Sequence, residues 1–275
     1  MTDYDPAAFD AYEERGWQAV ASAYAQHWSA LTSQAIGPLL DAASVAPGMR
    51  VLDVGTGSGD AAARAVERGA AATGVDVSAA MVEIASQRHP VATFVQASAT
   101  QLPFADDSFD AAVGNIVIQH IGEPERAARE LARVLASDGA VALSTWDEPE
   151  RSPFFAALLG AVADAEIPSP SEVPAGPSFF QFADEEVFRS LLEDAGFVGL
   201  DVTAITVDFR LRSVEELLTA LAEGTVRTGA LVRATHDEQR DRVRESLGAR
   251  IEPWRRGGGY VVPASIRIAS GRKPS

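Results

Sequence analysis

The chain of 275 residues contains no cysteine, which excludes disulfide bonds, thiolate metal sites and a cysteine nucleophile. It has 23 basic residues, of which Lys273 is the only lysine, and 39 acidic residues, so the formal net charge is −16. Nucleic acids and anionic membrane surfaces are poor partners for such a chain. It also lacks an apolar run of membrane-spanning length and the basic and apolar parts of a signal peptide. We therefore expect a cytoplasmic protein with neither nucleic acid nor membrane as its partner.

Residues 51–60 are the segment of the sequence that says most about the fold and the ligand. A short apolar run ends at a glycine cluster that includes Gly55 and Gly57, and an alanine-rich helical stretch follows at 61–68. A strand, a glycine turn and a helix in this order form the entry to a βαβ unit that binds a nucleotide-like ligand. A dinucleotide fingerprint requires a third glycine where Asp60 stands, so a nicotinamide cofactor is the least favoured interpretation.

A second strand is expected at 73–77, and it carries Asp76 21 residues after Gly55. A carboxylate at this strand end accepts hydrogen bonds from the two ribose hydroxyls of a bound nucleoside. The alternative is that Asp76 only caps the helix that follows, but Ser78 can take that role.

Four ordered motifs over residues 48–146 give the chain a family resemblance. The pattern Asp-x-Gly-x-Gly-x-Gly at 53–59 resembles motif I of class I S-adenosylmethionine (SAM) dependent methyltransferases, and Asp-x-Ser-x-x-Met at 76–81 resembles a run common in the small-molecule members. Residues 94–110 resemble the "GDA-x-x-LPF-x-x-x-x-FD" signature of the ubiquinone and menaquinone-biosynthesis type. Residues 130–139 resemble that group's "E-x-x-RVL-x-x-GG" helix and turn.

The resemblance implies SAM as the cofactor and a set of residues that bind it: Asp53, Gly55, Gly57, Asp76, Val77, Met81, Ser98, Ala99 and Asn115. In the family, the methionine of the second motif packs against adenine, a role suited to an adaptable thioether. The chain departs from the family at Ser98, where an aspartate usually accepts a hydrogen bond from the adenine amino group. A neutral hydroxyl is a weaker acceptor than a carboxylate, so weaker SAM binding is expected.

The expected fold is α/β, with a doubly wound, Rossmann-like sheet of seven strands whose last strand is antiparallel. We expect an N-terminal helical cap at 1–46, a SAM-binding core at 47–150, and lid segments with the strands that complete the sheet at 151–275, all in one compact domain.

Helices dominate the expected lid segments. A helix is predicted at 152–165, a strand at 198–211, and capping boxes at 213–216 and 235–238 begin two inserted helices. The proline-rich segment 166–182 is expected to be a loop over the active site, and the alternative is an ordinary surface connection.

His120 is the candidate general base, because it follows the fourth strand and imidazole titrates near neutrality. The alternative is that His120 only packs beside the cofactor or caps a turn. Tyr24, Trp28 and Thr32 of the N-terminal helices are candidates for covering cofactor or substrate, and aromatic residues at helical spacing are equally typical of a core. No convincing metal triad is found among the acids.

The predicted function is methyl transfer from SAM to a small, apolar or aromatic metabolite, by C- or O-methylation in natural-product or quinone-like tailoring. Two alternatives remain open: a SAM-binding fold that catalyses non-methylating chemistry, such as a cyclase or decarboxylase, and a non-catalytic binding subunit. A small molecule is the expected partner, and a homodimer is left open.

Overall fold

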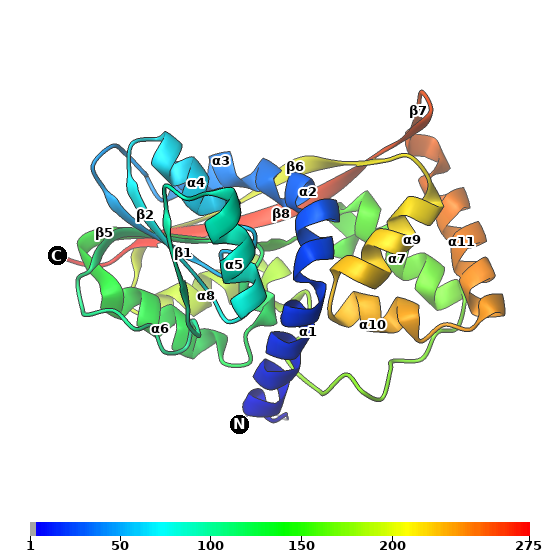
Figure 1. The fold of residues 1–275 in the computed structure, drawn as a ribbon, viewed down its shortest axis with the longest axis horizontal. Coiled ribbons are helices and arrows are strands. Elements are labelled where there is room, and N and C mark those ends of the chain that lie inside the picture. The colour runs from blue at the N-terminus through cyan, green and yellow to red at the C-terminus, as the bar shows by residue number, and fades with distance from the viewer. Residues whose placement is uncertain (1–3) are drawn as a thin grey trace.

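A central β-sheet with helices on both faces organises the computed structural model, which describes residues 4–275 (Figure 1). The strand order is β3–β2–β1–β4–β5–β8–β6, and the short β7 pairs with β8. The strands are β1 (Arg50–Val54), β2 (Ala71–Asp76), β3 (Thr93–Gln96), β4 (Phe109–Gly114), β5 (Leu135–Trp146), β6 (Val198–Leu211), β7 (Arg255–Arg256) and β8 (Gly259–Arg272). β1 to β5 are parallel, whereas β8 runs antiparallel to both β5 and β6. The predicted doubly wound sheet with an antiparallel last strand is confirmed.

The helices fall into layers and one separate cluster. They are α1 (Pro6–His27), α2 (Ser29–Thr32), α3 (Ile36–Ala42), α4 (Asp60–Glu67), α5 (Ala79–Arg88), α6 (Pro124–Val134), α7 (Pro153–Asp164), α8 (Glu185–Asp194), α9 (Val214–Gly224), α10 (Arg227–Arg233) and α11 (Asp237–Ile251). Helices α3 and α4 cover one face of the sheet, and α6 and α8 cover the other (Figure 1).

The strands alternate their side chains between these two faces. In β1, Val51 joins the core on the side of α4, while Leu52 and Val54 join the core on the side of α6. Apolar side chains on both faces of a strand are typical of a parallel sheet that is covered by helices on both sides.

Local sequence signals set the helix ends. Asp184 begins α8 by accepting from the backbone N–H of Glu186 and Val187, and the Ser213 hydroxyl begins α9 in the same way. The predicted start of α11 was wrong by one residue: His236 is the N-cap, and its capping box is completed by Gln239.

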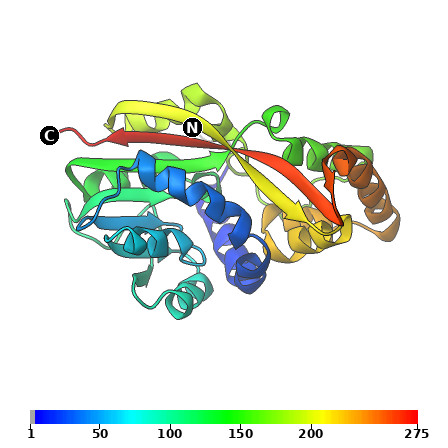
Figure 2. The same ribbon diagram turned by 90° about the horizontal axis from the view of Figure 1, so that it is seen from above.

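The long strands β6 and β8 extend beyond the rest of the sheet, over a cluster formed by α7, α9, α10 and α11 (Figures 1 and 2). Helices α9, α10 and α11 lie between β6 and β8 in the chain, where the helical insertion was predicted, although the short α10 was not predicted. Helix α1 packs between α5 on one side and α9 on the other, so it lies between the sheet edge and the helical cluster.

The segment between α7 and α8 contains neither helix nor strand from 167 to 180, as its prolines predict. Phe179 near its end lines the cavity described below.

Candidate active site

The glycine turn after β1 forms the floor of the site. Gly55 and Gly57 have φ values of +64° and +53°, a left-handed conformation that side chains rarely adopt. A Cβ on Gly55 would lie 2.2 Å from a methyl group of Val117, so only glycine fits between the two loops. A Cβ on Gly57 would lie 3.6 Å from the Tyr24 ring, which reaches over this turn from α1.

Asp76 ends β2 beside this turn, because β1 and β2 are parallel neighbours. Its two carboxylate oxygens accept from the backbone N–H of Gly57 and of Ser78, each at 2.9 Å. Burial raises the Asp76 pKa to about 6. Ser78, and not Asp76, provides the side-chain cap of α5, since its hydroxyl accepts from the Met81 N–H. The Asp76 carboxylate is therefore not used as the helix cap.

Asp53 lies in β1 beneath the turn. One of its oxygens accepts from the Thr56 hydroxyl at 2.6 Å and from the Ala62 N–H at 3.0 Å, which braces the turn against α4. Its other oxygen, Oδ1, is buried without a hydrogen-bond partner among residues 4–275. Burial is the main reason that the Asp53 pKa rises to about 7, and Asp76 and Asp60 add to the rise.

The principal cavity, of about 170 Å³, lies above the carboxyl ends of β1, β2 and β4. It brings together almost all of the predicted site residues. The residues on its cofactor side are Gly55, Gly57, Asp76, Val77, Met81, Ser98, Ala99 and Asn115, and those from the N-terminal helices are Tyr24, Trp28 and Thr32. His120 also lines it, whereas Asp53 lines a small adjoining hollow with Thr56 and Asp60.

Ser98 and Asn115 are both hydrogen-bonded within the protein. The Ser98 hydroxyl is bonded to the Thr100 hydroxyl at 2.8 Å and accepts from the Thr100 N–H at 3.2 Å. The Asn115 amide donates to the Thr32 carbonyl at 3.0 Å, and its oxygen accepts from the Ser144 hydroxyl at 2.8 Å. Asn115 thereby ties the N-terminal helices to the ends of β4 and β5.

The N-terminal helices form one wall. The hydroxyls of Tyr24 and Thr32 are 3.2 Å apart, and burial raises the Tyr24 pKa to about 12. Trp28 is 5% exposed, donates to the Ala220 carbonyl at 2.9 Å and packs on Phe209. Trp28 therefore belongs to the core as well as to the cavity wall.

The opposite end of the cavity is apolar and comes from segments far apart in the sequence. It is formed by β5, α7, the 167–180 segment and α9 through Trp146, Phe154, Phe155, Leu158, Phe179 and Leu221. The ring of Phe155 is in edge-to-face contact with Phe154, with centroids 5.0 Å apart, and in tilted contact with Phe179, with centroids 6.1 Å apart. Such walls suit a flat apolar molecule.

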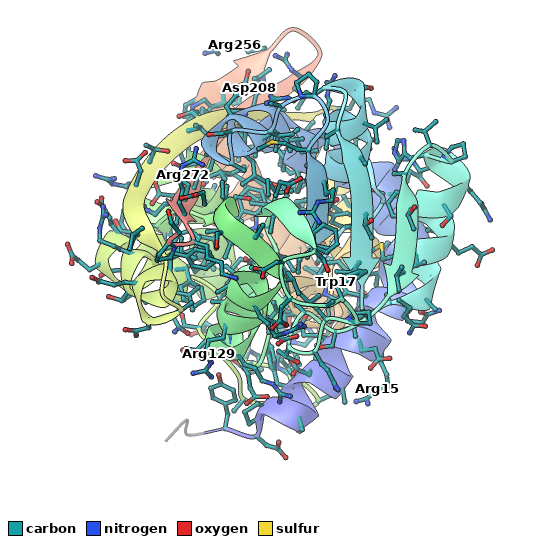
Figure 3. All side chains as sticks on the ribbon, turned by 90° about the vertical axis from the view of Figure 1, so that its left-hand side faces the viewer. Arg15, Trp17, Arg129, Asp208, Arg256 and Arg272 are labelled. Carbon is teal, nitrogen blue, oxygen red and sulfur yellow. The ribbon has the colours of Figure 1, made fainter. Side chains whose placement is uncertain are left out.

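His120 lines the same cavity. Its Nδ1 is 3.0 Å from a carboxylate oxygen of Glu13, and its ring is in edge contact with Trp17 and Phe179. Figure 3 shows Trp17 directed into the molecule from α1, while Arg15 points outward. Glu13, Trp17 and Arg227 were not predicted from the sequence, because they come from α1 and α10 and no local motif marks them.

The other histidines lie elsewhere. His27 is 3.8 Å from Glu223, His89 is 3.5 Å from Asp60, and His236 caps α11.

Among residues 4–275, no cluster of three or more His, Asp or Glu side chains is arranged to hold a metal ion. In the same part of the chain, no helix combines the length and apolar character that crossing a membrane requires.

The residues present fit SAM. The site joins the glycine turn to two buried acids, Asp76 at the end of β2 and Asp53 with its orphaned oxygen, and such acids favour a ligand that carries positive charge and hydrogen-bond donors.

In sequence, the chain is similar to known methyltransferases. The family model for the methyltransferase domain matches residues 52–143. A demethylmenaquinone methyltransferase of Beutenbergia cavernae is 30% identical over 176 residues, which cover 61% of this chain and 73% of that enzyme.

Solved structures share the fold. An N-methyltransferase of Haemonchus contortus with bound S-adenosylhomocysteine gives a TM-score of 0.58 at 18% identity, over 98% of this chain and 61% of that one. The [4+2]-cyclase SpnF gives a TM-score of 0.55 at 22% identity, over 90% of this chain and 83% of that one. The motifs, the site and the 30% identity together show that the chain belongs to the class I SAM-dependent methyltransferases of the quinone-biosynthesis type.

Proposed function

We propose that this enzyme transfers the methyl group of SAM to a small, apolar or aromatic acceptor in a natural-product or quinone-like tailoring reaction. The observation that carries the proposal is the continuity of the cavity, in which the predicted cofactor-binding residues, the aromatic end and His120 line one space. SAM supplies the electrophilic methyl group when it is bound. The protein must then hold the acceptor atom in line with that group and exclude water.

The aromatic lining of the cavity and the net charge of the chain support an apolar acceptor. Its far end contains four aromatic rings and two leucines, and the net charge of −16 disfavours polyanionic acceptors. The similarity to demethylmenaquinone methyltransferases supports a quinone-like ring as the first acceptor to test.

For the cofactor, we propose that Asp76 accepts the ribose hydroxyls and that Met81 packs on the adenine. The glycine turn and Asn115 lie at the methionine half, and Ser98 and Ala99 lie at the adenine edge. Support comes from the common cavity and from the free lone pairs that Asp76 keeps after its two backbone bonds.

For the chemistry, we propose that His120 is the general base. Its ring lines the cavity and contacts Phe179 of the aromatic end, so it can accept a proton from an acceptor that is bound there. An acceptor hydroxyl is the group that such a base serves most directly, since phenols hold their proton near neutral pH.

Calorimetric titration with SAM and S-adenosylhomocysteine tests the cofactor assignment. We expect both to bind, and Asp76→Asn to weaken binding roughly 10- to 100-fold, because hydrogen bonds to an ionised carboxylate are lost. Asp201→Asn on the edge strand β6 is the matched control, and it should bind like the wild type. Equal affinities in the Asp76 and Asp201 variants would contradict the proposed ribose contact.

A screen of naphthols, hydroxynaphthoquinones and their reduced forms tests the acceptor. We expect S-adenosylhomocysteine to form together with a product that is heavier by one methyl group. SpnF shows that the fold also serves a cyclase, so conversion of an acceptor without S-adenosylhomocysteine formation would favour non-methylating chemistry.

A further inference from the structure

Glu13 is a buried carboxylate on α1 that has no part in the cofactor site. Its side chain is 3% exposed and faces the cavity beside His120. Oxygen Oε2 accepts from the Trp17 indole N–H at 2.9 Å and lies 3.0 Å from Nδ1 of His120. Oxygen Oε1 lies 3.0 Å from Nε of Arg227.

Arg227 connects this carboxylate to the 167–180 segment. Its terminal nitrogens donate to the carbonyls of Pro177 at 3.1 Å and Gln119 at 2.7 Å. Its guanidinium lies between the rings of Phe9 and Phe179, about 5 Å from each.

The contact between Arg227 and Glu13 is electrostatic. The two atoms are at ion-pair distance, but Nε and Oε1 make no hydrogen bond of good geometry within residues 4–275. Burial lowers the Arg227 pKa and the Glu13 charge opposes that change, so Glu13 is the counter-charge of this buried cation.

An ionised carboxylate only accepts hydrogen bonds, so the imidazole nitrogen that faces it must carry a proton. In neutral His120 this places the hydrogen on Nδ1 and leaves the lone pair on Nε2. No described residue bonds to Nε2, and the side chain keeps 15% exposure at the cavity wall.

We infer that Glu13 is the positioning residue of His120, holding its ring with Nε2 ready to take a proton from an acceptor hydroxyl, and that Arg227 holds Glu13 for this role. The inference rests on the proposed methyl transfer. The acceptor oxygen forms a bond to the methyl carbon, the carbon–sulfur bond breaks with its electron pair on sulfur, and the acceptor proton moves to Nε2. The resulting imidazolium is stabilised by the Glu13 carboxylate.

Other ionisable groups also face this site and enter any pH profile. Asp10 accepts from the Gly122 N–H at 2.6 Å and lines the cavity, and burial raises its pKa. Tyr12 on the same helix has a raised pKa, mainly from burial and also from the Glu13 charge.

Long-range proton–nitrogen NMR of protein labelled with ¹⁵N-histidine tests the inference without any acceptor. The His120 signal is assigned from its absence in His120→Gln. At pH 8.5 we expect an unprotonated Nε2 and a protonated Nδ1 in the wild type. The opposite tautomer would overturn the inference, and this measurement needs no Glu13 variant.

Glu13→Gln then tests the carboxylate, with Glu14→Gln, which removes an exposed acid from the next position, as the matched control. We expect Glu13→Gln to lower the fraction of His120 that carries its proton on Nδ1, because a neutral amide oxygen is a weaker acceptor than a carboxylate, and Glu14→Gln to leave that fraction unchanged. An unchanged fraction in both variants would overturn the inference.

Titration of the same samples with S-adenosylhomocysteine separates the two proposals. Failure of the wild type to bind it would overturn the proposed function, whatever the His120 tautomer. Binding together with the wrong tautomer would overturn only the role of Glu13.

Discussion

Two buried aspartates make the folding stability of this enzyme depend on pH. Asp53 and Asp76 have pKa values raised to about 7 and about 6, in both cases mainly by burial. In the unfolded chain both ionise near pH 4. Between these values the folded state binds more protons than the unfolded state, so stability falls as the pH rises.

Asp53→Asn should remove part of this pH dependence. Asn has nearly the same shape, and its oxygen can accept from Thr56 and Ala62 as Asp53 does. Between pH 5 and pH 8 we expect the wild type to lose on the order of 2 kcal/mol more unfolding free energy than the variant. Urea denaturation at both pH values measures this, with Asp201→Asn as the control. Parallel pH profiles for wild type and Asp53→Asn would show that Asp53 does not titrate in this range.

At the level of secondary-structure elements, α10 is a short helix with a large effect on the site. Its first residue, Arg227, contacts α1 through Glu13, the β4–α6 connection through Gln119 and the 167–180 segment through Pro177. We propose that these contacts hold that segment over the cavity as a lid.

Arg227→Met keeps the length of the side chain and removes all its N–H donors and its charge. It leaves Glu13 buried without its counter-charge, which should cost roughly 3 kcal/mol of unfolding free energy. We also expect faster hydrogen exchange in peptides from 167–180, measured by mass spectrometry.

Arg240→Met is the matched control, because Arg240 is exposed on α11. It should change neither quantity. If exchange in 167–180 stayed at the wild-type rate in Arg227→Met, Arg227 would not hold the segment.

In the whole molecule, the long strands β6 and β8 belong to the sheet and also extend over the helical cluster (Figure 2). The ligand site lies between these parts, with walls from the sheet edge, from α1 and from the cluster. We therefore propose that the chain unfolds as one domain, and that a bound cofactor stabilises all of it.

Calorimetric unfolding should show a single transition that shifts as a whole with ligand. At 100 times the dissociation constant, S-adenosylhomocysteine should add about 2.7 kcal/mol. For a chain of this size that corresponds to a rise in Tm of roughly 5–10 °C. Two transitions, of which only one shifts, would instead show that the helical cluster unfolds separately.

The sequence alone was sufficient to predict the features that depend on local or periodic patterns of residues. The glycine turn, the acid at the end of β2 and the bounds of β6 are encoded by residues that are near neighbours in the chain. Backbone conformation and strand burial depend on such short-range patterns, so the fold and most of the cofactor-side cavity could be predicted.

Only the tertiary structure placed Glu13 against His120, which lies 107 residues farther along the chain, and against Arg227, which lies about twice as far in the same direction. No periodicity or motif in the sequence predicts such a contact. A buried charge cluster depends on how α1 and α10 pack together, and not on the residues that are its neighbours in the sequence. For the same reason, the sequence could not decide whether Trp28 covers the site or belongs to the core. In the structure it lines the cavity, and it also packs on Phe209 and donates a hydrogen bond to the Ala220 carbonyl.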